Sequence, residues 1–148
     1  MNSEATARQE KSEQLVYATV LEIGMYIGLL LLFVTFALYV SGAVAPAVPL
    51  EQVSNYWSHG VHGYLEAVNG DFLHMEEPPT GWMWVTMLNR GDFLNFVGIA
   101  ILAGVTIFCY LAIVPTLLGK KDNAYLVMAL LEVLVLVLAA SGILAVGH

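Results

Sequence analysis

Three long apolar stretches constrain the fold of this chain more than any other feature. They run from about Leu15 to Val40, from Phe93 to Leu118 and from Ala124 to Val146. Each is at least as long as the roughly 20 residues that a helix needs to cross a hydrocarbon core of about 30 Å. Because lipid cannot hydrogen-bond an open backbone, such a stretch crosses the membrane as a helix. The sequence therefore predicts an all-α membrane protein with three transmembrane helices.

The composition supports this class and excludes others. Of 148 residues, 59% are hydrophobic and 11% are charged, whereas a soluble domain carries about a quarter charged residues. A net charge of −7 with only five Lys and Arg residues argues against nucleic acid as a partner, because phosphate binding needs clustered cations. The single cysteine, Cys109, lies in an apolar stretch and is interpreted as a packing residue.

Cofactor ligands are missing from the predicted spans. No Cys-x-x-Cys pair occurs, and no histidine lies within the three apolar stretches, whereas haem and iron–sulfur groups in helical bundles need such ligands. We therefore expect no cofactor bound by this chain alone and no self-contained enzyme active site, although the chain can belong to an enzyme complex.

The positions of the basic residues predict the orientation. Arg8 and Lys11 precede the first stretch, and Lys120 and Lys121 lie between the second and third. The segment 41–92 has one basic residue and six acids. Because Lys and Arg are retained on the cytoplasmic side, we expect an N-in, C-out topology in a bacterial-type inner (cytoplasmic) membrane.

These observations define one integral membrane domain covering residues 1–148. Its expected parts are a cytoplasmic tail (1–14), a first span (15–40), an outer loop (41–92), a second span (93–118), a cytoplasmic turn (119–123) and a third span (124–146).

The outer loop contains a segment with helical spacing of apolar residues. Its stripe consists of Val53, Tyr56, Trp57, Val61, Tyr64 and Leu65. Because Tyr and Trp favour the headgroup region, the pattern predicts an interfacial amphipathic helix over 50–67. Gly60 and Gly63 weaken that helix by about 1 kcal/mol each relative to alanine. The expected interface anchors are Tyr56, Trp57, Trp82 and Trp84.

Two acids lie within the predicted spans. Glu22 and Glu132 fall about 10 Å and about 14 Å inside the membrane from the cytoplasmic ends of their helices, and a charge at a span centre costs about 2.5–3.5 kcal/mol. Tyr110 and Tyr26 fall at similar depths, so the four residues are expected to form one polar layer. The layer is either a proton or cation relay or a contact for a quinone head group, or its carboxyl groups are protonated and hydrogen-bond to a neighbouring helix or partner subunit.

Two further patterns have alternative interpretations. His59, His62 and Glu66 share one face of a continuous helix and could hold a divalent metal; the alternative is a solvated or partner-facing surface. Small residues that allow helices to approach closely either pack the three helices together or receive other chains. They are Gly24, Gly28, Gly98, Gly104 and Gly142.

Residues 88–144 contain Arg90-Gly91-Asp92, Gly98, Thr106 and Asp122-x-x-Tyr125. With these residues, the segment resembles a family of small uncharacterised prokaryotic three-helix membrane proteins. Members are often encoded beside transporters of the sulfite-exporter type or among other membrane-complex genes, so the resemblance implies a three-helix membrane topology. This chain departs from the family where Thr106 is followed by Ile107-Phe108-Cys109-Tyr110 instead of a proline and then a basic residue.

Together these features predict a non-catalytic accessory or scaffold subunit of a multi-subunit inner-membrane complex, of a respiratory or electron-transfer kind. The alternative is an auxiliary small subunit of an anion or organic-acid transporter. The expected partners are other integral membrane subunits, lipid, and a periplasmic subunit on the 41–92 loop.

Overall fold

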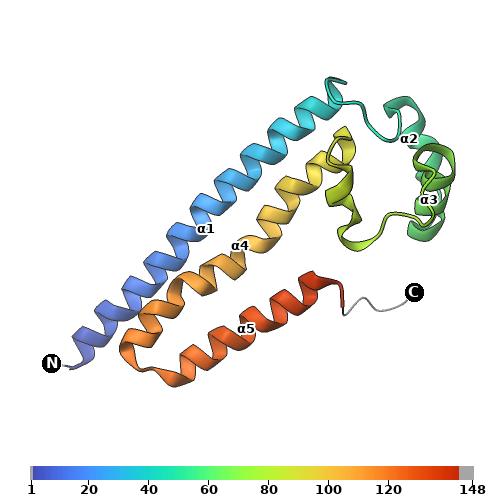
Figure 1. Ribbon diagram of the computed structural model, residues 1–148. Helices are drawn as coiled ribbons and strands as arrows, with labels where there is room; N and C mark the ends of the chain where they lie inside the picture. Colours follow the sequence, from blue (N-terminus) through green and yellow to red (C-terminus); the bar gives the residue numbers. More distant parts are fainter. Residues whose placement is uncertain (1, 144–148) are drawn as a thin grey trace. The chain divides into compact units, whose positions relative to one another are not determined.

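The computed structural model describes the backbone of residues 2–143 and the side chains of residues 11–143. This part of the chain is helical and contains no strand (Figure 1). Its elements are α1 (Asn2–Val40), α2 (Leu50–Tyr56), α3 (Val61–Val68), the π-helix η1 (Asn69–Leu73), the 3-10 helix η2 (Gly81–Met87), α4 (Gly91–Lys120) and α5 (Asn123–Ser141). The predicted all-α class is confirmed.

Three of these helices are long and apolar enough to cross a membrane, as the sequence predicts. The candidate spans are Lys11–Val40, Gly91–Lys120 and Asn123–Ser141, and the most apolar 18-residue windows within them have mean hydropathies of 2.3, 2.6 and 2.4. The third ends five residues before the expected limit, because Gly142 adopts a left-handed conformation with φ of 75°, which terminates helices. Residues 144–146 of the expected third span lie outside the described residues.

The chain divides into two compact units. The first unit comprises residues 1–27 and 101–148, and the second comprises residues 28–100. In the first unit, α5 follows the turn after α4 and runs back in the opposite direction (Figure 1). The early part of α1 contacts the late part of α4 in antiparallel order: the Tyr17 ring lies edge-on to Tyr110, and Gly24 lies directly against Val105.

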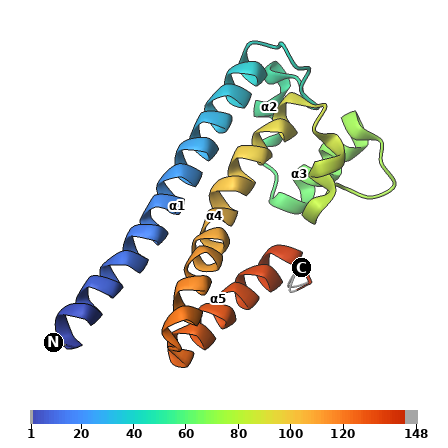
Figure 2. The ribbon, with the colours of Figure 1, turned by 60° about the vertical axis from the view of Figure 1, so that its left-hand side comes forward.

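The second unit contains the end of α1, the outer segment and the start of α4. Here too the two long helices are antiparallel, since Leu32 contacts Gly98 and Tyr39 contacts Gly91. Figure 2 shows α2 and α3 in the connection between them. The side chain of Asn69 closes the following loop by two hydrogen bonds of 3.0 Å with the backbone of Met75.

The outer helix predicted over 50–67 is two helices. α2 ends at Tyr56 and α3 begins at Val61. Gly60 between them is extended, with φ of −64° and ψ of 166°. The physical reason is that glycine is among the least favourable residues in a helix, so the apolar stripe does not overcome its cost at this point.

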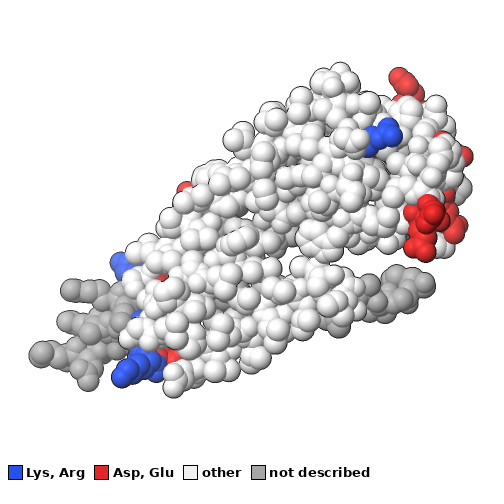
Figure 3. Space-filling model, in the orientation of Figure 1, with Lys and Arg blue, Asp and Glu red and all other residues white. Residues whose placement is uncertain are grey.

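Charges separate along the chain as the sequence indicates. In the second unit, acidic residues gather over the outer segment (Figure 3); they include Glu51, Glu66, Asp71, Glu76 and Glu77. In the first unit, lysines lie at the turn between α4 and α5, with Lys121 in a left-handed conformation (φ of 58°).

Candidate functional site

The histidines of the outer segment do not form the predicted metal site. His62 Nε2 lies 3.1 Å from Glu66 Oε1, but His59 lies in the break before α3, with its ring beside Tyr56. The prediction assumed one continuous helix, and the break at Gly60 removes that condition. Among the described residues, no group of three or more His, Cys, Asp or Glu side chains could hold a metal ion.

Asp92 organises a polar site in the second unit. Its Oδ1 and Oδ2 each accept a hydrogen bond of 3.0 Å from the Ala47 amide, and Oδ2 accepts one of 3.3 Å from the Val48 amide. Oδ1 also accepts from the Phe93 amide at 3.1 Å, at the start of α4. Ala47 and Val48 are only 5% and 3% exposed. We call these contacts, with the 3.1 Å bond from the Gly91 amide to the Ala45 carbonyl, the Asp92 clasp.

The Asp92 clasp explains why positions 91 and 92 are a glycine and an aspartate. A Cβ atom at Gly91 would lie 2.7 Å from the Val44 carbonyl oxygen, so the close approach of the chain requires glycine. A carboxylate follows because the amides of the loop after α1 and of the first turn of α4 need an acceptor. The sequence resemblance included Gly91 and Asp92 without assigning them this role, although an acid at a helix start is a recognisable signal.

The predicted interface anchors fall into two groups. Trp57 is 74% exposed, as an anchor requires. Trp84 lies half-buried between the rings of Trp82 and Phe96, each stacked on it at a centroid distance of 5.9 Å. Tyr56 packs its ring on Tyr64 and Phe72, so it contributes to the packing of the outer segment itself.

Tyr56 also makes a specific polar contact. Its hydroxyl donates a 2.7 Å hydrogen bond to Asp71 Oδ2. This bond, with smaller contributions from burial and from the charge of Asp71, raises the pKa of Tyr56 above its ordinary value of 10.0. The pKa of Tyr64 is raised by burial and by the negative charge of Asp92.

Replacing Asp71 with alanine is expected to lower the pKa of Tyr56 toward 10.0, because both the acceptor and its charge are removed. Since the raised pKa favours the neutral phenol in the folded protein, this contribution to stability is present below pH 10.0 and is lost as the pH rises through the pKa of folded Tyr56. Tyrosinate absorbance, measured against a Tyr56→Phe variant, gives the titration of Tyr56. Glu77→Ala is the matched control, and an unchanged titration in Asp71→Ala would contradict the assignment.

The predicted intramembrane polar layer is only partly assembled. Tyr110 contacts Tyr17 edge-on at a centroid distance of 5.8 Å, whereas Glu132 on α5 is exposed. Glu22 and Tyr26 are exposed as well. The reason is rotational: Glu22 lies about 140° around α1 from Tyr17 at 100° per residue. Tyr17, which the sequence did not indicate, is therefore the residue of α1 that contacts Tyr110.

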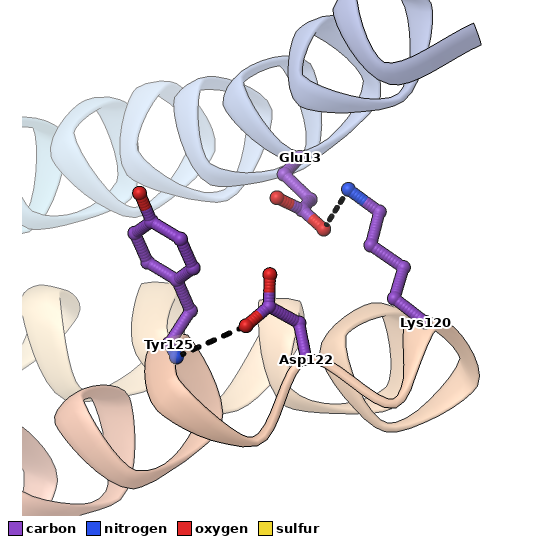
Figure 4. Close-up of polar contacts among 4 residues, drawn as sticks. All are labelled: Glu13, Lys120, Asp122 and Tyr125. Atoms are coloured by element: carbon purple, nitrogen blue, oxygen red, sulfur yellow. Dashed lines mark hydrogen bonds and ion pairs between the residues drawn. The ribbon is translucent and has the colours of Figure 1, made fainter. Parts of the chain in front are cut away.

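An ion pair joins α1 to the end of α4. Lys120 Nζ lies 2.6 Å from Glu13 Oε1, and both side chains are largely buried (Figure 4). Beside them, Asp122 caps α5 by accepting a 3.5 Å hydrogen bond from the Tyr125 amide. This contact gives the Asp122-x-x-Tyr125 pattern a structural role at the helix start.

Open grooves follow α1 and α4 in the described part of the first unit. One, of about 270 Å³, is lined by Glu13, Gln14, Tyr17 and Ile113. Another, of about 280 Å³, is lined by Val20, Ile23, Gly24, Ile101, Val105 and Phe108. Neither is lined by a nucleophile paired with a base.

The predicted packing glycines have different roles. A Cβ atom at Gly24 would collide with Val105, and one at Gly98 would lie 2.8 Å from the Leu32 amide nitrogen. Gly28 is buried. Gly104 has no atom within 4 Å of its added Cβ, and Gly142 ends α5. Gly104 and Gly142 therefore do not pack helices within the described chain, because their surroundings are open.

Comparison with known proteins identifies a close relative. A protein of Archaeoglobus fulgidus is 45% identical over 141 residues, which cover 95% of each chain, and it carries the name "Uncharacterized protein". No family model matches the chain, and no solved structure does. At this identity and coverage, the chain belongs to the same protein family as the protein of Archaeoglobus fulgidus.

Proposed function

We propose that this chain is a non-catalytic accessory subunit of a multi-subunit complex in the cytoplasmic membrane. The observation that carries the proposal is that both intramembrane acids, Glu22 and Glu132, are exposed on the surface of the chain. Ionisable side chains within spans almost always face protein or a water-filled cavity. Partner helices that cover these carboxyl groups would give them hydrogen bonds that lipid tails cannot.

The helix α5 supports association most directly. Only 6% of its most apolar window is buried within the chain, and Glu132 lies beside exposed Leu131 and Val135. A helix that was covered by lipid alone would gain nothing from an acid at this position. We therefore assign the Glu132 side of α5 to contact with other integral membrane subunits.

The orientation that we propose places the amino terminus inside and the carboxyl terminus outside. Support comes from Lys11, Lys120 and Lys121 at one end of the spans and from the acidic outer segment at the other. On the outer side, exposed Trp57, Val61 and Trp82 suit a segment that lies at the membrane surface. The same segment would receive a subunit on the outer side of the membrane.

Purification of the tagged chain from its native membranes in mild detergent tests the proposal. We expect other membrane chains to be recovered in a fixed ratio, and we expect Glu132→Leu to reduce that recovery at least about tenfold, since each lost contact of 1.4 kcal/mol is tenfold in affinity. Leu130→Ala is the matched control, because Leu130 is exposed but lies about 160° around α5 from Glu132 at 100° per residue. Recovery of the chain alone would refute the proposal.

The recovered partners also decide between the two kinds of complex. Subunits that carry haem or flavin would support a respiratory or electron-transfer complex, which is our first choice. A single polytopic carrier would support the alternative, an auxiliary subunit of an anion or organic-acid transporter. The resemblance to proteins encoded beside sulfite-exporter-type transporters supports this transporter alternative.

A further inference from the structure

The outward face of α1 carries a regular series of large side chains that the rest of the described chain leaves uncovered. Its members follow each other at alternating distances of three and four residues after Glu22; they are Leu15, Glu22, Tyr26, Leu29, Phe33 and Phe36. All are exposed, Phe33 to 74%. This spacing is the a/d pattern of helices that pair along a shared seam.

The opposite face of α1 is already in use. Gly24 lies against Val105 in the first unit, while Leu32 contacts Gly98 in the second and Thr35 is buried. α4 therefore already covers the small residues of α1 that would let another helix approach closely. Of the exposed surface that α4 leaves on the described part of α1, the face with Glu22 is the one that carries an acid.

Lipid is a poor neighbour for this face. Glu22 lies about 10 Å along the helix from Leu15 at 1.5 Å per residue, and a carboxyl group at such a depth needs a hydrogen-bond partner. Within the described residues, no hydrogen bond or ion pair involves Glu22, and the hydroxyl of Tyr26 on the same face has no hydrogen bond either. The face thus presents one acceptor and one donor, both unpaired.

We propose that a second copy of this chain binds along this face, with the Tyr26 hydroxyl of each copy donating to the Glu22 carboxyl of the other. All copies enter the membrane in one orientation, so the two α1 helices are parallel and equal residues lie at equal depth. Helical side chains lean toward the amino terminus, which brings the Tyr26 hydroxyl back to the level of Glu22, one turn earlier. A two-fold axis then forms two equal bonds.

A second copy fits this face better than an unrelated helix. Glu22 needs a donor and Tyr26 needs an acceptor, and a second copy supplies both. The two copies lie at the same depth, so these groups are level with each other. The inference goes beyond the proposed accessory role, because the pairing requires only this chain and would be present in the purified protein.

Sedimentation equilibrium of the purified full chain in mild detergent tests the pairing. We expect a mass of two copies for the wild type. Tyr26→Phe, which removes only the donor, and Glu22→Leu should each raise the dissociation constant at least about tenfold. Glu22→Gln keeps an acceptor and should stay close to wild type. Glu132→Leu, at the other intramembrane acid, is the matched control and should leave the dissociation constant unchanged.

Disulfide cross-linking in membranes tests the face independently. In a Cys109→Ala background, Phe33→Cys on the seam should form a disulfide-linked pair, whereas Val135→Cys, an exposed position on α5, should not. A mass of one copy for the wild type at all concentrations, a wild-type dissociation constant for Tyr26→Phe, or cross-linking through Val135→Cys alone would each overturn the proposal. A purified pair without co-purified partners would leave this inference standing and remove the proposed function.

Discussion

Replacing Asp92 with alanine is expected to lower the free energy of unfolding by about 2–4 kcal/mol, the largest effect of any single polar substitution that we predict. Alanine leaves the Ala47 and Val48 amides, on nearly buried residues, without their acceptor, and an unpaired buried amide costs about 1–3 kcal/mol. The bonds that are lost are charge-assisted, which makes them stronger than neutral ones.

Equilibrium unfolding in mixed detergent, followed by helical circular dichroism, measures this effect. Asp92→Asn keeps one acceptor oxygen and should fall between alanine and wild type. Asp71→Ala removes an exposed hydrogen bond in the same unit and should cost at most about 1 kcal/mol. Equal losses for Asp92→Ala and Asp71→Ala would show that the clasp does not hold the loop to α4.

Gly98→Ala is the second substitution with a large expected effect. The added Cβ would lie 2.8 Å from both the amide nitrogen and the Cβ of Leu32, and 2.9 Å from its Cα. Because two of these atoms belong to the backbone, α1 and α4 must separate locally to accept the methyl group. Overpacking of this kind costs about 1–3 kcal/mol.

Gly104→Ala is the matched control for this prediction, since it makes the same change in the same helix. No atom lies within 4 Å of the Cβ that it adds, and alanine favours a helix over glycine by up to about 1 kcal/mol. The two variants should therefore shift the unfolding midpoint in opposite directions. A destabilised Gly104→Ala together with an unaffected Gly98→Ala would place the α1–α4 contact elsewhere.

The two proposals assign different contacts to the two intramembrane acids. Glu132 on α5 serves contact with other membrane subunits, and Glu22 on α1 serves contact with a second copy. Substitution of one acid should leave the contact of the other intact, because they lie on different helices and neither hydrogen-bonds to the other. The experiments can therefore refute either contact while the other stands.

The sequence did not predict side-chain positions that depend on contacts between distant parts of the chain. The four-residue polar layer was placed by depth alone, but depth does not determine which way a side chain points around its helix. Only the packing of α1 against α4 turns Tyr17 toward Tyr110 and leaves Glu22 outside. Likewise, the metal interpretation of His59 and His62 depended on a continuous helix, which the break at Gly60 prevents.

The three apolar helices themselves follow from the sequence alone, because their length and hydropathy are local properties and lipid permits only a helix there. The charge separation along the chain is equally a matter of sequence. The role of Asp92 required the tertiary structure, since its partners Ala47 and Val48 lie more than 40 residues earlier. Which glycines are indispensable was decided in the same way, by the backbone that lies opposite each one.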